Sequence, residues 1–190
     1  LVYDAQRAVT VLFGGAADTE TWEWDGAAWT LRGANCPSGR TDSAMAHDSN
    51  RGVSVLFGGY DGDLAGDTWE WDGAGWSQRF ASGPSARHEH AMAFDSARGV
   101  TVLFGGDDGD YDGETWEWDG TAWLQRPVNG PSPRSNSAMT YDSLRGVMVL
   151  FGGTRGGLNG PYNSETWEWD GTLWTQRIVS GPSGRFDHAM

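Results

Sequence analysis

Lysine is absent from the 190-residue chain, and its arginines are outnumbered by 26 acidic residues, which gives a formal net charge of −13. This balance argues against nucleic acid as a partner, because nucleic-acid binding is driven by neutralisation of phosphates. It also disfavours an anionic membrane surface. Cations and basic partners remain open, although a high negative charge also serves solubility alone.

Cysteine is nearly absent as well. Cys36 is the single one, so an internal disulfide and a cysteine-based zinc cluster are both excluded. A lone cysteine is more often a packing residue than a reactive one. No stretch reaches the roughly 18 apolar residues of a membrane-spanning helix. The sequence also lacks the apolar periodicity of amphipathic helices, which favours an all-β fold.

Tryptophan, by contrast, is abundant, and all 12 tryptophans lie in four copies of the stretch Thr-Trp-Glu-Trp-Asp-Gly-x-x-Trp. The copies occupy residues 21–29, 68–76, 115–123 and 166–174. Two further motifs recur in phase with them, Val-Leu-Phe-Gly-Gly and Pro-Ser-x-Arg-x-x-x-Ala-Met. Self-similarity at a period of about 47 residues predicts one structural unit that is built four times.

Each unit is expected to contain four short strands. In the second unit these are residues 44–47, 53–57, 68–71 and 76–79, separated by Gly- and Asp-rich turns. Four strands per period are typical of a β-propeller blade. The small residues of the first strand place it nearest the axis. The tryptophans of the outer strands are expected to form the core between blades, because each buries a large apolar surface.

These motifs resemble the kelch repeat. The residues that carry the resemblance in one unit are Gly58, Gly59, Asp67, Trp69, Trp71, Asp72, Trp76 and Arg87. The resemblance covers the whole chain and implies an all-β fold, a kelch-type β-propeller with four blades of four antiparallel strands, in a single domain over residues 1–190. Most kelch propellers are protein-binding modules. A minority are enzymes, including a copper oxidase similar to galactose oxidase and a sialic acid isomerase.

Kelch rings usually have five to seven blades, whereas this chain has material for four. Residues 185–190 correspond to the beginning of an inner strand and residues 1–4 to its end. Unpaired strand edges tend to recruit another chain. We therefore expect that missing sequence or self-association completes a larger ring. The alternative is a self-closed ring with Met190 beside Leu1.

One face of such a propeller collects most of the charged loops. It carries the Asp-rich loops between the second and third strands, and the Pro-Ser-x-Arg loops with Arg40, Arg87, Arg134 and Arg185. In some kelch adaptors, arginines at the Arg87-type position bind an acidic peptide, so the resemblance implies ligand binding by these four. The alternative is that each arginine pairs with a carboxylate of a neighbouring blade and clamps the repeats together.

Histidines and carboxylates on this face suggest two further sites. His88 and His90 lie two residues apart, so on a strand they would share one face. With His188 they could bind a ligand or a transition metal, although Ser43 and Ser137 replace histidine in the other units. A copper oxidase would also need a tyrosine beside Cys36, and the repeat places none there.

Asp108, Asp110 and Asp112 alternate along a Gly-containing loop, a pattern that can wrap Ca²⁺. The alternative for this loop is a solvated acidic turn, and only weak calcium binding is expected.

The turns of the opposite face repeat almost unchanged, whereas the charged face differs from unit to unit. Its variable triplets occupy residues 41–43, 88–90, 135–137 and 186–188, and its longest loop spans 156–164. Diversity on a constant scaffold is typical of a recognition surface. We therefore expect a non-catalytic module that binds a protein or glycan through this face. A structural unit without a ligand and a kelch-fold enzyme are the alternatives, although no catalytic constellation stands out.

Overall fold

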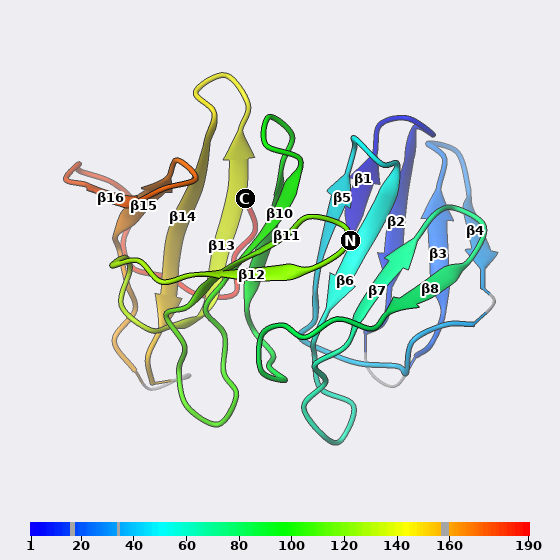
Figure 1. Cartoon of the computed structure of the whole chain (residues 1–190), viewed down its shortest axis with the longest axis horizontal. Coiled ribbons are helices and arrows are strands. Elements are labelled where there is room, and N and C mark those ends of the chain that lie inside the picture. Colours follow the sequence, from blue (N-terminus) through cyan, green and yellow to red (C-terminus); the bar gives the residue numbers. More distant parts are fainter. Residues whose placement is uncertain (16–17, 34, 157–159) are drawn as a thin grey trace.

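The computed structural model describes residues 1–15, 18–33, 35–156 and 160–190. They form four antiparallel sheets of four strands, each with its strands in chain order (Figure 1). The first blade consists of β1 (Val2–Asp4), β2 (Val9–Phe13), β3 (Thr21–Trp24) and β4 (Trp29–Arg32). The second consists of β5 (Ala44–Asp48), β6 (Val53–Phe57), β7 (Thr68–Trp71) and β8 (Trp76–Arg79). The third consists of β9 (Ala91–Asp95), β10 (Val100–Phe104), β11 (Thr115–Trp118) and β12 (Trp123–Arg126). The fourth consists of β13 (Ser135–Asp142), β14 (Val147–Thr154), β15 (Thr166–Trp169) and β16 (Trp174–Arg177).

The architecture confirms the all-β, four-bladed propeller-like fold expected from the repeat. In the second blade, only β5 differs from the expected bounds, since it extends one residue further to Asp48. The fourth blade departs more, because β14 continues through Gly152 and Gly153 to Thr154 and pairs there with Ser135 of β13. The longest loop, expected over 156–164, includes residues 157–159, which lie outside the described residues. No described segment forms a helix that could cross a membrane.

The first strands of the blades pack side by side in chain order. β5 lies between β1 and β9, and β9 lies between β5 and β13, whereas no comparable packing joins β13 to β1. The first blade, in blue, and the fourth, in yellow to red, lie on opposite sides of the view in Figure 1. The four blades therefore form an open array among the described residues. Segment 185–190 packs on the fourth blade, where the Gly153 amide donates to the Arg185 carbonyl at 2.9 Å.

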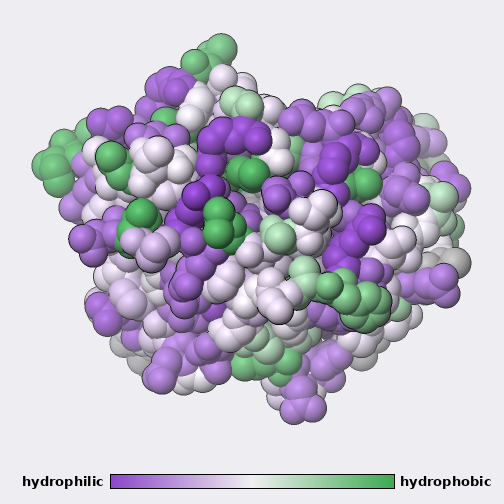
Figure 2. Space-filling view, viewed as in Figure 1, coloured by the Kyte–Doolittle hydropathy of each residue, from purple (hydrophilic) through white to green (hydrophobic). Residues whose placement is uncertain are grey.

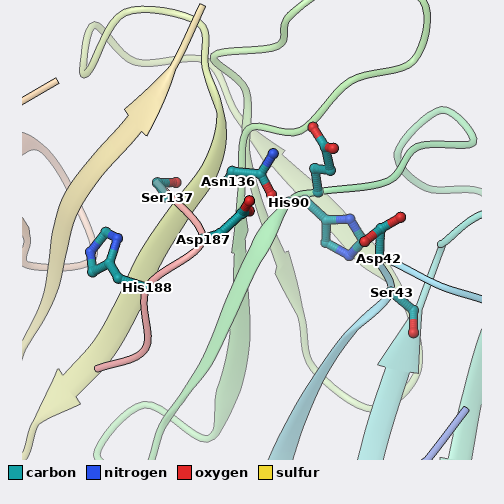
Figure 3. A pocket seen from close by; sticks show the side chains of 8 residues that line it. Asp42, Ser43, His90, Asn136, Ser137, Asp187 and His188 are labelled. Atoms are coloured by element: carbon teal, nitrogen blue, oxygen red, sulfur yellow. The ribbon is translucent and has the colours of Figure 1, made fainter. Parts of the chain in front are cut away.

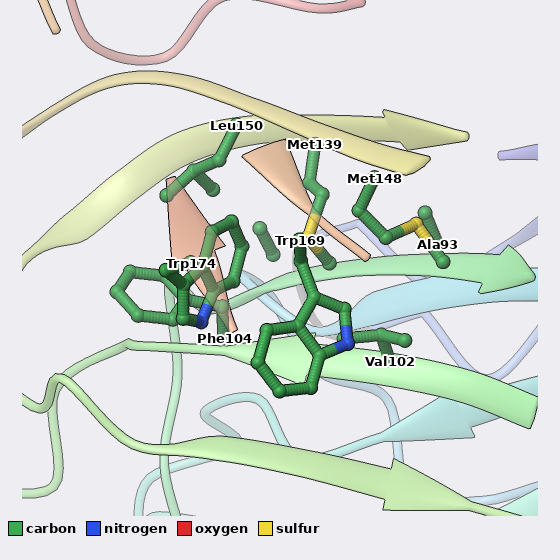
Figure 4. Close-up of a cluster of buried hydrophobic side chains, with 9 residues drawn as sticks. Ala93, Val102, Phe104, Met139, Met148, Leu150, Trp169 and Trp174 are labelled. Atoms are coloured by element: carbon green, nitrogen blue, oxygen red, sulfur yellow. The ribbon is translucent and has the colours of Figure 1, made fainter. Parts of the chain in front are cut away.

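In the second, third and fourth blades, the last tryptophan of the motif packs against the preceding blade. Trp123 packs edge-on against Phe57, with ring centroids 5.3 Å apart, and its Nε1 donates to Oγ1 of Thr68 at 2.9 Å. The same pair of contacts joins Trp76 to the first blade and Trp174 to the third. Figure 4 shows the last of these interfaces, where Trp169 and Trp174 lie among apolar side chains of both blades. The second and third tryptophans of the last three motifs are buried core residues, as expected, whereas Trp29 of the first motif is 45% exposed.

A buried glutamate completes each interface. Glu117 accepts from Trp169 Nε1 of the next blade at 3.1 Å and from Arg126 Nε of its own blade at 2.7 Å, and it also pairs with Arg98. Glu23 and Glu70 are held in the same way and receive Trp71 and Trp118. A charge in the interior is tolerated only when it is paired and hydrogen-bonded. These glutamates satisfy the indole N–H groups that the tryptophan-rich core would otherwise leave unpaired.

Candidate functional site

The four variable triplets converge at one end of the inner strands. Figure 3 shows the hollow that they line, which encloses about 160 Å³ and which we call the mouth. Its lining residues are Asp42, Ser43, Glu89, His90, Asn136, Ser137, Asp187 and His188. Each triplet thus contributes one pair of neighbouring residues. This is the face on which the sequence places the charged loops.

The middle residue of each triplet adopts a left-handed backbone conformation. Its φ is 55° at Asp42, 57° at Glu89, 54° at Asn136 and 51° at Asp187. Asp and Asn tolerate this region better than most residues, whereas Glu has no such advantage. This conformation lets the backbone N–H of one triplet donate to the backbone carbonyl of the triplet before it in the chain. Glu89 donates to Asp42, Asn136 to Glu89 and Asp187 to Asn136. A chain of backbone hydrogen bonds therefore fixes the positions of these four side chains.

Three of these four side chains are carboxylates, and the fourth is an amide. Burial, and then the negative charges of Glu89 and Asp42, raise the pKa of Asp187 above its ordinary value. The carboxylates of different blades are thus close enough to repel one another. A cationic group that entered the mouth would relieve this repulsion.

Behind the carboxylates, serine and histidine alternate from blade to blade. His90 is buried edge-on against Phe57, and burial, with a smaller effect of Arg87, lowers its pKa to about 3. Burial also lowers the pKa of His188, which packs in the same way on Phe151. Both rings are therefore neutral at neutral pH.

Several polar atoms of this inner layer are buried without a partner. Within the described residues, neither ring nitrogen of His90 or His188 makes a hydrogen bond of normal geometry, and the Ser137 hydroxyl makes none. Buried polar groups are usually paired. The inner layer therefore offers donors and acceptors to a ligand or to water.

His88 does not join the other two predicted histidines. Its backbone pairs with Asp107, and its ring lies 6.2 Å from that of Tyr60, away from the mouth. The expectation that His88 and His90 share one face of a strand is wrong, because the left-handed Glu89 breaks the alternation and β9 begins only at Ala91. Among the residues that the structure describes, no group of three or more His, Cys, Asp or Glu side chains is arranged to hold a metal.

Three of the four predicted arginines are buried clamps. The backbone carbonyl of Arg87 accepts a hydrogen bond from the Gly59 amide of the second blade at 2.9 Å. Its guanidinium donates to Glu114 of the third blade at 2.8 Å and contacts Asp112 at 3.1 Å. Arg40 and Arg134 repeat this arrangement with Asp67 and Glu165. The clamp, left open by the sequence as the alternative, is therefore the observed role, and these guanidinium groups are not presented to an external ligand.

Arg185 differs from the other three arginines. Its side chain is exposed, and its Nε donates to the Ser183 carbonyl at 3.2 Å. Within the described residues it forms no ion pair like those of Arg40, Arg87 and Arg134. Ligand binding by Arg185 stays a prediction.

The Asp-rich loop of the third blade folds largely on itself. The Asp108 amide donates to the Asp110 carbonyl at 3.2 Å, and the Asp108 carboxylate accepts from the Ser85 hydroxyl at 2.7 Å. Asp110 is exposed, whereas Asp112 is partly buried beside Arg87. Calcium binding by Asp108, Asp110 and Asp112 stays a prediction, which Asp110→Asn tests by calorimetric titration.

Replacing Asp112 by asparagine should stabilise the protein at alkaline pH. Burial, which outweighs the attraction of Arg87, raises the pKa of Asp112 to about 6, and Asp108, Glu114 and Asp107 add to the rise. The folded state therefore favours the protonated form, and stability is lost as the pH rises through 6. Each pH unit between the ordinary and the raised pKa corresponds to ~1.4 kcal/mol. Asp112→Asn should therefore raise the free energy of unfolding by about 2–3 kcal/mol at pH 8.

This gain in stability should vanish below about pH 4, where Asp112 is protonated and therefore as neutral as the asparagine that replaces it. Denaturant unfolding at both pH values, in the presence of a chelator, measures it. The matched control is Asp110→Asn, an exposed position in the same loop, which should change the free energy of unfolding less than Asp112→Asn does. An equal gain at both pH values would contradict the assignment.

A second hollow, of about 490 Å³, lies at the opposite end of the inner strands. Its wall contains the repeated Met45, Met92, Met139 and Met190, with an aromatic or imidazole ring from each blade, Tyr3, His47, Phe94 and Tyr141. The residues of this wall are similar from blade to blade. The mouth, whose residues differ between blades and carry charge, is therefore the stronger candidate for selective recognition.

Sequence reasoning located the mouth only in part. The variable triplets marked the right segments, but the predicted site residues omitted Asp42, Glu89, Asn136 and Asp187. A pattern in the sequence could have identified them, because every unit has Asp, Glu or Asn at this position, immediately before a histidine or serine.

Comparison with known proteins supports the fold and no more. No family model matches the chain, and no curated protein matches it. A solved structure described as that of YjhT superposes with a TM-score of 0.77 over 97% of this chain and 67% of that one, at 16% sequence identity. At this level of identity the likeness is one of fold. The chain thus has an all-β, four-bladed propeller-like architecture similar to that of YjhT.

Proposed function

We propose that the chain is a non-catalytic, kelch-type binding module that recognises a protein or a glycan through its charged loop face. The observation that carries the proposal is the convergence of the four variable triplets on one mouth. Each triplet is fixed by the repeated backbone bonds, while its side chains differ. A rigid frame that presents diverse side chains suits recognition, because little entropy is lost when the ligand binds.

The chemistry of the mouth defines the group that it receives. Three carboxylates at the rim favour a positive charge, and the neutral imidazoles and hydroxyls behind them offer hydrogen bonds to N–H and O–H groups. A hollow of about 160 Å³ admits one side chain or one sugar ring rather than a folded segment. The mouth best fits a basic side chain of a protein partner, and the hydroxyl-rich ring of a glycan is the other candidate.

Neutralising the rim should abolish binding without unfolding the protein. The test variant carries Asp42→Asn, Glu89→Gln and Asp187→Asn, and the control carries Asp18→Asn, Asp63→Asn and Asp110→Asn, which remove equal charge from exposed loops. The probes are immobilised arginine- or lysine-containing peptides and a panel of neutral glycans. Binding that falls at least about tenfold in the test variant alone supports the proposal, since losing a charged hydrogen bond costs about 1.5–3 kcal/mol.

Two results would overturn this assignment. One is binding that the two variants weaken equally, which would make it a general charge effect. The other is a ligand footprint on the conserved turns of the opposite face. A panel that yields peptide binders but no glycan binders would settle the ligand class in favour of a protein partner.

A further inference from the structure

Carboxylates reach the mouth from three separate triplets. Asp42, Glu89 and Asp187 line it together with the amide of Asn136, and Figure 3 shows Asp42, Asn136 and Asp187 on different segments of the chain. Burial raises the pKa of Asp187, and the negative charges of Glu89 and Asp42 raise it further. The three charges therefore act on one another, and a cation between them would be attracted by all three.

A buried imidazole forms part of the wall behind the carboxylates. His90 is 6% exposed and lines the mouth, and within the described residues neither of its ring nitrogens makes a hydrogen bond of normal geometry. A neutral imidazole has one nitrogen that accepts a hydrogen bond. Because a buried polar group without a partner is unfavourable, a ligand that brings an N–H group to this nitrogen supplies a bond that the chain leaves unmade. The mouth therefore calls for a cation that is also a hydrogen-bond donor.

The clamps inside the protein show how this chain holds a guanidinium group. Arg87 donates to the backbone carbonyls of Ser85 and Gly105 at 3.2 and 3.1 Å, and to the Glu114 carboxylate at 2.8 Å. Arg134 is likewise held by two backbone carbonyls and one carboxylate. A guanidinium group has five N–H donors in one plane, and the backbone carbonyls satisfy part of them here. A site for arginine is therefore expected to offer free carbonyls.

In the mouth, the backbone carbonyls are engaged. Those of Asp42, Glu89 and Asn136 each accept the amide of the next triplet. The acceptors that face a ligand are therefore side chains, namely the rim carboxylates, the Asn136 amide oxygen and a ring nitrogen of His90. An ammonium group is a compact charge whose three donors can turn towards separate acceptors. It fits this arrangement better than the flat fork of a guanidinium group does.

The rings that line the mouth are imidazoles. Among the described residues of its wall there is no Phe, Tyr or Trp face on which a ligand could stack. Methylated ammonium groups are recognised by cages of aromatic faces, and full methylation also removes the N–H donors that the rim and His90 would receive. The wall therefore favours an ammonium group that keeps all of its N–H donors.

The basic residues of the chain itself agree with this choice. All 13 are arginines, and Arg32, Arg145 and Arg177 are about half exposed. A mouth that accepted guanidinium groups would bind the exposed arginines of other copies of the chain. A mouth that selects ammonium groups leaves these side chains aside, which is a form of discrimination against the wrong partner.

We propose that the mouth selects the unmodified ε-ammonium group of a lysine side chain on a partner protein. The ammonium group donates to the rim carboxylates and to a ring nitrogen of His90, and the lysine stem leads out to solvent. This inference rests on the proposed function of the mouth, and it narrows the ligand from any basic side chain or glycan to lysine.

Short, labelled Gly-Ser peptides that differ in one central residue test this selection. The residue is lysine, arginine, trimethyl-lysine or acetyl-lysine, and binding to the 190-residue chain is followed by fluorescence anisotropy at low ionic strength. The lysine peptide should bind at least about tenfold more tightly than the arginine and trimethyl-lysine peptides, because hydrogen bonds to charged groups are worth about that factor or more. Trimethyl-lysine keeps the charge but has no N–H group, so it separates hydrogen bonding from charge attraction. The acetyl-lysine peptide should not bind.

A substitution inside the mouth tests the part played by His90. His90→Phe keeps a ring against Phe57 but removes both ring nitrogens, and it should weaken binding of the lysine peptide at least about tenfold. His88→Phe is the matched control and should leave the affinity unchanged, because the His88 ring lies beside Tyr60 and outside the mouth. Thermal unfolding verifies that both variants fold, and the peptide series on the wild type decides the question if His90→Phe does not.

Two results would overturn the selection of lysine. One is an arginine or trimethyl-lysine peptide that binds as tightly as the lysine peptide, and the other is an unchanged affinity in a folded His90→Phe variant. If arginine peptides or neutral glycans bind instead, and neutralising the rim abolishes their binding, the proposed function stands and this inference alone fails. If neither a peptide nor a glycan binds, both fail.

Discussion

Replacing Trp123 by alanine should lower the free energy of unfolding by about 3–5 kcal/mol, the usual cost of truncating a large buried aromatic side chain. The substitution removes the edge contact with Phe57, leaves the Thr68 hydroxyl without its indole donor and opens a cavity over Gly83. Because the interface joins the second and third blades, the loss should appear in global unfolding. Denaturant titration followed by fluorescence of the remaining tryptophans measures it.

The matched control is the same substitution at the same repeat position of the first blade. Trp29→Ala removes a side chain that contacts Trp24 but no preceding blade. At low protein concentration it should cost about 1 kcal/mol, the value of an aromatic pair. Equal losses at the two positions would show that the tryptophans act within their own blades rather than between blades.

Replacing Glu117 by glutamine should destabilise the protein by about 3 kcal/mol, at the lower end of the cost of breaking a buried ion pair. The variant keeps the shape of the side chain but removes the charge that Arg98, Arg126 and the Trp169 indole share. Both arginines are partly exposed and can turn towards water, which keeps the cost at the lower end. Unfolding in denaturant at pH 7 is the measurement.

Glu168→Gln is the control, because Glu168 pairs with two arginines that are about half exposed and receives no tryptophan among the described residues. Glu168 is itself buried, at 6% exposure, but its two arginines stay about half in water, so its loss should cost less than that of Glu117. A Glu168 variant as damaging as the Glu117 variant would contradict the view that the indole N–H and the lower exposure of the paired arginines set the cost.

The strands could be predicted from the sequence because every unit repeats the same apolar and turn signals. Val53–Phe57 and Thr68–Trp71 begin and end where expected, since Gly and Asp-Gly turns bound them on one or both sides. Burial of Trp118 could be predicted from its size alone. Local signals and tertiary packing agree at these positions, and such agreement makes a structure readable from its sequence.

The candidate site could be predicted less well, for two physical reasons. The left-handed backbone at Glu89 cancels the strand alternation on which the pairing of His88 with His90 depended. The burial of Arg87 could not be inferred from its residue type, because arginine is usually exposed unless it is paired. Its partner Glu114 lies 27 residues away and is brought near only by the fold. The open array depends on the relation between blades, about which a local pattern says little.

Each blade packs only on its immediate neighbours, so the stability of the four blades follows that of a linear array of repeats. β5 contacts β1 and β9, and β9 contacts β5 and β13, so four blades share three interfaces. In such an array the stability is approximately a sum of unit terms and nearest-neighbour coupling terms. The two central blades are coupled on both sides, while each terminal blade is coupled on one. Partial unfolding should therefore begin at either end and move inward, and the residues that shape the mouth between the second and third blades should be the last to lose their order.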